Sequence, residues 1–123
     1  MTAKDPDEEA IREVVGLYFT GTYQGDAEQL KKAYHKDVQI FGCIGGKQFV
    51  WSLSDFIARV TQKPTAAEKG EKFDKKVLFI DRTQEIAMVK ARVFAAGLYF
   101  TDYITLLKTD GRWWIRCKSF TAS

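Results

Sequence analysis

The side chain best placed for acid–base chemistry is the carboxylate of Asp102. Alternate residues of a strand share one face, so Asp102 is predicted to point inward together with its apolar neighbours Phe100 and Ile104. A carboxylate in such surroundings is costly unless it is paired, protonated or close to water. Asp102 is therefore either a candidate acid or base, or a structural carboxylate held by backbone amides, Arg92 or Lys118.

Tyr18 and His35 are the other two candidates. Tyr18 lies on the apolar stripe of a predicted helix, where it is either a core tyrosine or a hydrogen-bond donor to a ligand. His35 is the only histidine, and imidazole is the natural acid or base near neutral pH. It is predicted to end the second helix, where it either touches a ligand or caps the helix. With no second histidine, and no cysteine or carboxylate at ligand spacing, we expect neither a metal site nor a cofactor.

Three helices are predicted to position these residues. Asp5, Pro6 and Glu8 combine a cap, a proline at the first helical position and a capping-box partner, and an apolar stripe ending at Tyr18 follows. A second helix is predicted after Asp26, and a third after Ser52 or Ser54. Apolar residues at helical spacing support both.

The remaining apolar segments have strand character. They cover residues 38–41, 47–51, 73–80, 86–94, 99–108 and 112–120. Three helices followed by a meander of four strands predict one α+β domain over residues 1–123, with the helices on one face of the sheet. Four aromatic residues are predicted to line its interior cavity or to fill it: Phe41, Trp51, Phe56 and Trp113.

The residue pattern of the last two predicted strands also indicates a protein partner. The interior face of the last strand is assigned to Trp113, Ile115, Cys117 and Ser119, which leaves Trp114, Arg116, Lys118 and Phe120 on the outside. The outer faces of both strands are then rich in Tyr, Thr and Trp. Because this is more apolar than a face in water requires, we expect a second subunit to cover it in a homodimer.

Composition excludes several other classes of function. The net charge is +3, and the densest basic stretch, Lys69 to Lys76, is interrupted by Glu71 and Asp74. It does not have the pattern of basic and aromatic stacking residues that a nucleic-acid reader needs, so we expect no nucleic-acid partner. The longest segment without a polar side chain is far short of the roughly 20 residues that cross a bilayer. Met1 to Glu9 is charged and is expected to carry no secretory signal. Two cysteines are too few for a disulfide scaffold, so we expect a cytoplasmic location.

Three segments in this order resemble the nuclear transport factor 2-like superfamily, and within it the bacterial group called putative lumazine-binding or SnoaL-like. They are Tyr23 to Asp26 after the first helix, Ala33 to Val38 entering the first strand, and Phe100 to Trp113 near the end. The resemblance covers nearly the whole chain. It implies a cystatin-like α+β fold in which the sheet curls around the first helix and leaves a ligand cavity at its open end.

The resemblance also implies roles for individual residues. Relative to ketosteroid isomerase, a member of the same superfamily, Tyr18 falls at the oxyanion-binding tyrosine and Asp102 falls near the protonated aspartic acid. Gly42 falls where the proton-shuttling carboxylate should be, so that isomerisation is not expected. Three readings stay open. They are a small-molecule-binding domain, an isomerase, cyclase or dehydratase that uses Asp102 or His35 with Tyr18, and a purely structural or protein-interaction domain.

Overall fold

The first helix begins where the capping pattern predicts. In the computed structural model, which describes residues 5–122, α1 spans Pro6–Gln24 and the Asp5 carboxylate accepts a hydrogen bond from the Asp7 amide at 3.0 Å. Gly25 ends the helix in the left-handed conformation, with φ of 64°. Residues 1–4, the first part of the segment expected to carry no secretory signal, lie outside the described residues.

Two shorter helices follow, α2 (Ala27–Ala33) and α3 (Leu53–Val60). Asp26 caps α2, as predicted. Of the two serines predicted as alternatives for α3, Ser52 is the cap, and it forms a reciprocal capping box with Asp55. Within residues 5–122, no helix combines the length and the apolar character needed to cross a bilayer.

The second helix ends earlier than predicted. The backbone becomes extended at Tyr34, with φ of −94° and ψ of 131°, so His35 lies on a strand and not at the end of the helix. The Tyr34 ring is buried, and its centroid lies 5.7 Å from that of Tyr18. This tertiary contact outweighs the helical pattern of the local sequence.

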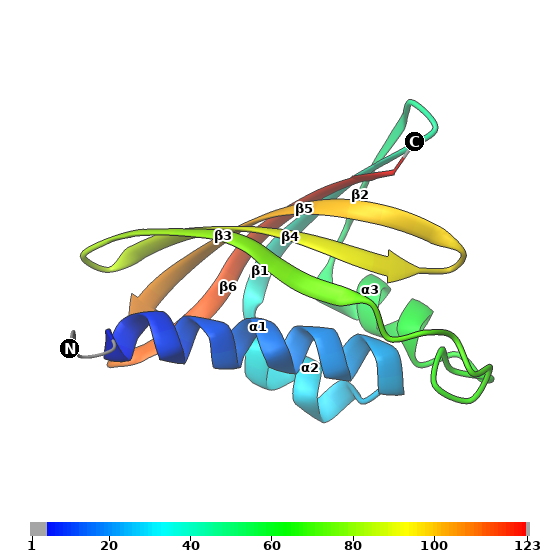
Figure 1. The fold of residues 1–123 in the computed structure, drawn as a ribbon, viewed down its shortest axis with the longest axis horizontal. Helices are drawn as coiled ribbons and strands as arrows, with labels where there is room; N and C mark the ends of the chain where they lie inside the picture. Colours follow the sequence, from blue (N-terminus) through cyan, green and yellow to red (C-terminus); the bar gives the residue numbers. More distant parts are fainter. Residues whose placement is uncertain (1–4, 123) are drawn as a thin grey trace.

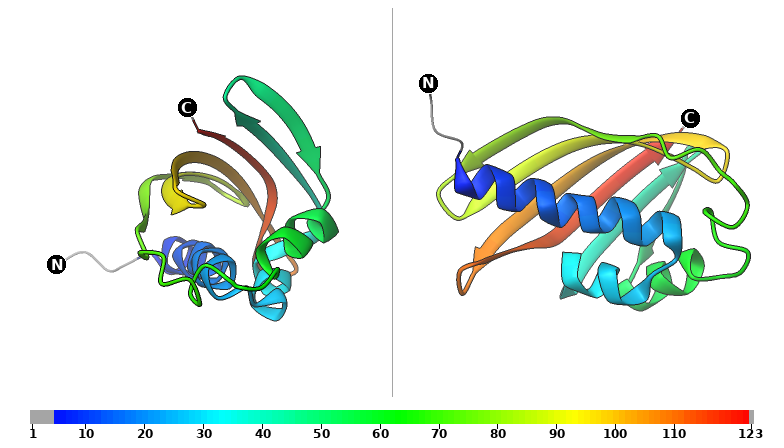
Figure 2. Two further views of the ribbon diagram at one scale, coloured as in Figure 1. Left: turned by 90° about the vertical axis from the view of Figure 1, so that its right-hand side faces the viewer. Right: turned by 60° about the horizontal axis from the view of Figure 1, so that its bottom comes forward.

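The six strands form one open sheet in the order β2-β1-β6-β5-β4-β3. Their bounds are β1 Tyr34–Ile44, β2 Lys47–Trp51, β3 Lys75–Thr83, β4 Ile86–Ala95, β5 Leu98–Thr109 and β6 Arg112–Ala122. Neighbouring strands are antiparallel, except that β1 runs parallel to β6. The three helices lie on one side of the sheet (Figure 1), which curves around α1 (Figure 2, left). The predicted α+β fold is confirmed.

The predicted faces are confirmed for β5 but only for the first half of β6. Asp102 is buried, with an exposed fraction of 1%. In β6, Trp113 and Ile115 are buried as predicted, but beyond them the inward residues are Lys118 and Phe120.

A β-bulge explains the error. Leu106 pairs with Ile115 and the preceding Thr105 pairs with Cys117, which leaves Arg116 as an extra residue in β6. One extra residue in a strand reverses the alternation of faces after it. Lys118 is therefore turned from the outside of the sheet to the inside.

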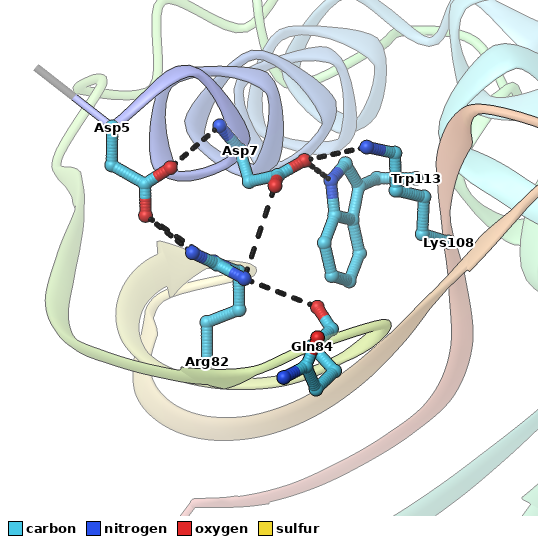
Figure 3. Close-up of polar contacts among 6 residues, drawn as sticks. All are labelled: Asp5, Asp7, Arg82, Gln84, Lys108 and Trp113. Carbon is cyan, nitrogen blue, oxygen red and sulfur yellow. Dashed lines mark hydrogen bonds and ion pairs between the residues drawn. The ribbon is translucent and has the colours of Figure 1, made fainter.

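A polar network joins the start of α1 to the sheet (Figure 3). Asp7 accepts hydrogen bonds from Trp113 Nε1 and from Lys108 Nζ, both at 2.9 Å. Arg82 on β3 forms an ion pair with Asp5 at 2.8 Å. The hydrogen bonds from Trp113 and Lys108 hold the pKa of Asp7 below its ordinary value, and the hydrogen bond from Arg82 does the same for the pKa of Asp5.

We expect the variant Asp7→Asn to unfold at a lower temperature than the wild type at pH 7, and this difference to be smaller at pH 3. A carboxylate with a lowered pKa stabilises the fold above its unfolded value, here 3.8, and loses that contribution as the pH falls through the folded value. Thermal unfolding followed by circular dichroism at both pH values measures the difference. The control Glu28→Gln removes only an exposed ion pair and should match the wild type at both.

Candidate functional site

A cavity of about 440 Å³ lies between the helices and the sheet. Its walls come from α1, α3, the sheet and the segment between α3 and β3, from which Lys63, Thr65 and Glu71 contribute. Tyr18, Asp102 and Lys118 are buried polar members of the lining, with exposed fractions of 3% or less.

The side chains of Tyr18 and Asp102 form a hydrogen bond with each other. The Tyr18 hydroxyl donates to Asp102 Oδ2 at 2.6 Å, and both side chains are buried. Burial raises the pKa of Asp102, while the charge of Lys118 and the hydrogen bond from Tyr18 act against that rise. Burial, followed by the charge of Asp102, raises the pKa of Tyr18 well above its ordinary value. At 2.6 Å this is a short O–H···O hydrogen bond, and the Tyr18 hydroxyl can donate its one proton to a ligand oxygen only after that proton leaves Asp102.

Lys118 is the functional candidate that the sequence placed on the wrong side of the sheet. Its Nζ lies 4.0 Å from the Tyr18 ring centroid and 4.2 Å from that of Phe56. Burial lowers its pKa to about 8, although the charge of Asp102 acts in the opposite direction. The sequence named Lys118 as a partner for Asp102 but gave no sign of the bulge that turns it inward.

Two of the four further cations of the lining are Lys75 and Arg59. Lys75 donates to the Phe94 carbonyl at 3.1 Å, and burial lowers its pKa. Arg59 stacks over the Trp51 ring, with its guanidinium carbon 4.4 Å from the ring centroid. Both side chains would be available to an anionic part of a ligand.

Four of the seven predicted site residues meet at this cavity: Tyr18, Trp51, Phe56 and Asp102. The other three lie elsewhere. His35 packs edge-on against Trp114 at 5.8 Å, and its Nδ1 accepts from the Asp37 amide. Phe41 lines a separate groove on the outer face of the sheet.

Trp113, the remaining predicted residue, is buried at the start of α1, where its indole donates to Asp7. Within residues 5–122, no three histidine, cysteine or acidic side chains come close enough together to hold a metal ion.

Gly42 packs against aromatic rings. It is the residue that aligns with the proton-shuttling carboxylate of ketosteroid isomerase. A Cβ built there would lie 2.4 Å from Phe49 and 2.7 Å from Phe120, well inside van der Waals contact. A carboxylate at residue 42 is therefore excluded unless these rings move.

The same geometry predicts that Gly42→Ala lowers the free energy of unfolding by about 1–3 kcal/mol, the usual cost of overpacking a core. Urea unfolding measures the change. Gly16→Ala is the matched control, because its Cβ meets nothing within 4 Å in the middle of α1. That substitution should raise stability by about 0.5–1 kcal/mol. Equal effects of the two substitutions would contradict the packing described.

Solved structures with the same fold come from several bacteria. An NTF2-like protein of unknown function from Shewanella baltica has a TM-score of 0.87 and 21% identity, with coverage of 100% of this chain and 98% of that one. An NTF2-like protein of unknown function from Methylobacillus flagellatus has a TM-score of 0.85 and 26% identity, with coverage of 99% and 96%.

The sequence comparisons also cover most of the chain. The aldolase FrzH from Cladobotryum sp. is 26% identical over 114 residues, which are 91% of this chain and 88% of that protein. The family described as putative lumazine-binding matches residues 6–121. This match spans all six strands and all three helices of the NTF2-like fold. The chain belongs to the putative lumazine-binding family.

Proposed function

We propose that this domain binds a small, mostly apolar organic molecule in the cavity, with Tyr18 and Asp102 fixing the polar edge of that molecule. The observation that carries the proposal is the buried Tyr18–Asp102 hydrogen bond at the wall of an aromatic cavity. A volume of about 440 Å³ is within the usual range for small-molecule sites. A few convergent polar groups among apolar walls are the general pattern of such sites.

The hydroxyl of Thr22 gives further support. Its oxygen is buried in the lining and makes no hydrogen bond with the described residues. A buried hydroxyl without a partner is unfavourable, so a ligand that bonds to it would remove that cost. Trp51, Phe56 and Phe120 supply flat apolar walls.

Thermal shift against pterins, flavins, steroids and polyketide-like aromatic compounds tests the proposal. A ligand present at a hundred times its Kd stabilises the folded state by about 2.7 kcal/mol, which is a shift of several degrees for a domain of this size. Tyr18→Phe should weaken binding by about tenfold, because one hydrogen bond to the ligand is lost. His35→Ala, outside the cavity, should leave binding unchanged. If no compound stabilises the protein, the proposal is wrong.

A second candidate function is an enzyme of the isomerase, cyclase or dehydratase type. Asp102 would act as acid or base and Tyr18 as oxyanion donor. Two observations favour it: burial moves the pKa of Asp102 upward, toward the range useful for proton transfer, and the chain is similar to a protein named as an aldolase. His35 was proposed as an alternative acid or base, but its place beside Trp114 favours Asp102. Activity that survives both Asp102→Asn and His35→Ala would exclude this mechanism.

We also propose a homodimer through the outer face of the sheet. Phe41, Met88 and Tyr103 are between 38% and 56% exposed on that face, beside a groove of about 710 Å³. A second copy would cover this apolar surface. Sedimentation at micromolar concentration should show a dimer, and Tyr103→Glu should shift it to a monomer, while Lys31→Glu on α2 should not. A monomeric wild type would remove the idea.

We propose the cytoplasm as the location of this protein. Cys43 and Cys117 are free thiols, as is usual for proteins of a reducing compartment. Cell fractionation with an antibody against the chain would test this.

A further inference from the structure

We infer that Lys118 is a nucleophilic amine that forms an imine with a carbonyl compound carrying an anionic group in the cavity. This inference rests on the proposed binding function and names a covalent role and a ligand class for the same cavity. Its starting observation is that the Lys118 side chain is 2% exposed and belongs to the lining of the cavity.

The amino group of Lys118 is not engaged by a carboxylate. Among residues 5–122 it makes no hydrogen bond or salt bridge, and its close neighbours are the rings of Tyr18 and Phe56. Lys108 shows the contrasting arrangement, since its Nζ lies 2.9 Å from an Asp7 carboxylate oxygen. A lysine whose only role is structural would be expected to have such a partner when buried.

Burial in these surroundings also favours the reactive form. Only the neutral amine is a nucleophile, and an apolar pocket lowers the cost of losing its proton. With the pKa of Lys118 lowered to about 8, roughly a tenth of the molecules carry the neutral amine at pH 7. At the ordinary value of 10.5 the neutral fraction would be several hundred times smaller.

The neighbouring groups can complete the reaction. Nitrogen of the neutral amine attacks the carbonyl carbon, and the carbon–oxygen π electrons move to oxygen. That oxygen takes one proton from the amine and a second from an acid, and leaves as water, so the nitrogen keeps one proton as an iminium ion. Asp102, whose pKa is raised by burial, and its partner Tyr18 stand beside Lys118 as the acid and as donors to the oxygen.

The charges around the cavity indicate the rest of the ligand. Besides Lys118, its lining carries four cationic side chains and two carboxylates: Arg59, Lys63, Lys69 and Lys75 against Glu71 and Asp102. Such an excess favours a ligand that brings negative charge. The class is therefore a carbonyl compound with one anionic group, such as an oxo acid, whose apolar part meets the aromatic walls.

Reductive trapping tests the inference. The wild type is incubated at pH 8 with pyruvate or acetoacetate and with sodium cyanoborohydride, and modified lysines are mapped by peptide mass spectrometry. We expect a secondary amine at Lys118 at a level at least tenfold above any other lysine. Pyruvate should modify Lys118 several-fold faster than acetone, which lacks the carboxylate.

Three variants serve as controls, each checked for folding by circular dichroism. Lys118→Met and Lys118→Arg should lose the adduct at residue 118. Lys36→Met, which removes an exposed amine of β1 outside the cavity, should keep the adduct at Lys118. Loss of the adduct in a folded Lys118→Arg variant shows that the primary amine, and not the positive charge, is required.

The possible failures are distinguishable. No adduct at Lys118, or modification at the level of exposed lysines, overturns the inference. If thermal shift still detects ligands in that case, the proposed binding function stands without the covalent step. If neither adduct nor stabilisation is found, the inference and the proposed function are both wrong.

Discussion

Replacement of Asp102 by alanine is expected to lower the free energy of unfolding by about 1–3 kcal/mol at pH 7, the usual cost of leaving a buried hydrogen-bond donor without its acceptor. The Tyr18 hydroxyl would lose its acceptor, now 2.6 Å away, in a place where water does not replace it. Lys118 would lose the charge that favours its protonated form. Urea unfolding followed by circular dichroism measures the change.

Two further variants separate these contributions. Asp102→Asn keeps an oxygen that can accept from Tyr18, so its loss should be clearly smaller than that of the alanine variant. The double variant Tyr18→Phe with Asp102→Leu replaces both polar groups by apolar ones and should recover part of the stability. Equal losses in the alanine and asparagine variants would show that the hydrogen bond contributes little.

Replacement of Lys118 by methionine is expected to remove a rise of about 2 kcal/mol in stability between pH 8 and pH 10. The pKa of Lys118 is about 8 in the folded protein and 10.5 as its ordinary value, so the folded state loses its proton first. The unfolded state binds more protons in this interval, and stability therefore rises by at most about 1.4 kcal/mol for each pH unit. Below pH 8 the buried ammonium imposes its full cost, so the methionine variant has its greatest relative stability there.

The stabilities of the wild type and Lys118→Met are best compared between pH 8 and pH 10. Burial raises the pKa of Tyr18 and Tyr34, so above pH 10.0 the unfolded state releases their protons first and stability falls. That fall occurs in the wild type and in Lys118→Met alike and cancels in their difference. Lys36→Met, on an exposed part of β1, should follow the wild type. Parallel curves for Lys118→Met and the wild type would contradict the lowered pKa.

Local sequence was sufficient for the elements and for part of the site. The cap at Asp5 and the apolar spacing that ends at Tyr18 placed α1 and the tyrosine on its buried side. Alternation along β5 placed Asp102 inward, because a regular strand has a strict period of two. These signals depend only on residues close together in the chain.

The meeting of Tyr18 and Asp102 depends on the whole fold, because 84 residues separate them. The curvature of the sheet around α1 brings them together, and the resemblance to a family with that curvature was the only guide to it in the sequence. His35 shows the opposite case. A strand replaces the predicted end of the helix, since Tyr34 packs in the core, and carries His35 to Trp114 and away from the cavity.

The side of the sheet on which Lys118 lies was decided by tertiary structure alone. The sequence around it alternates regularly and assigned it to the outside of the sheet. The extra residue Arg116 exists only relative to the partner strand, because a bulge is a mismatch in pairing between β5 and β6 and not a property of either sequence. The sequence by itself determined which chemical groups the domain carries and the local elements that hold them. The pairing of β5 with β6 and the curvature of the sheet around α1 decided which of those groups share the cavity.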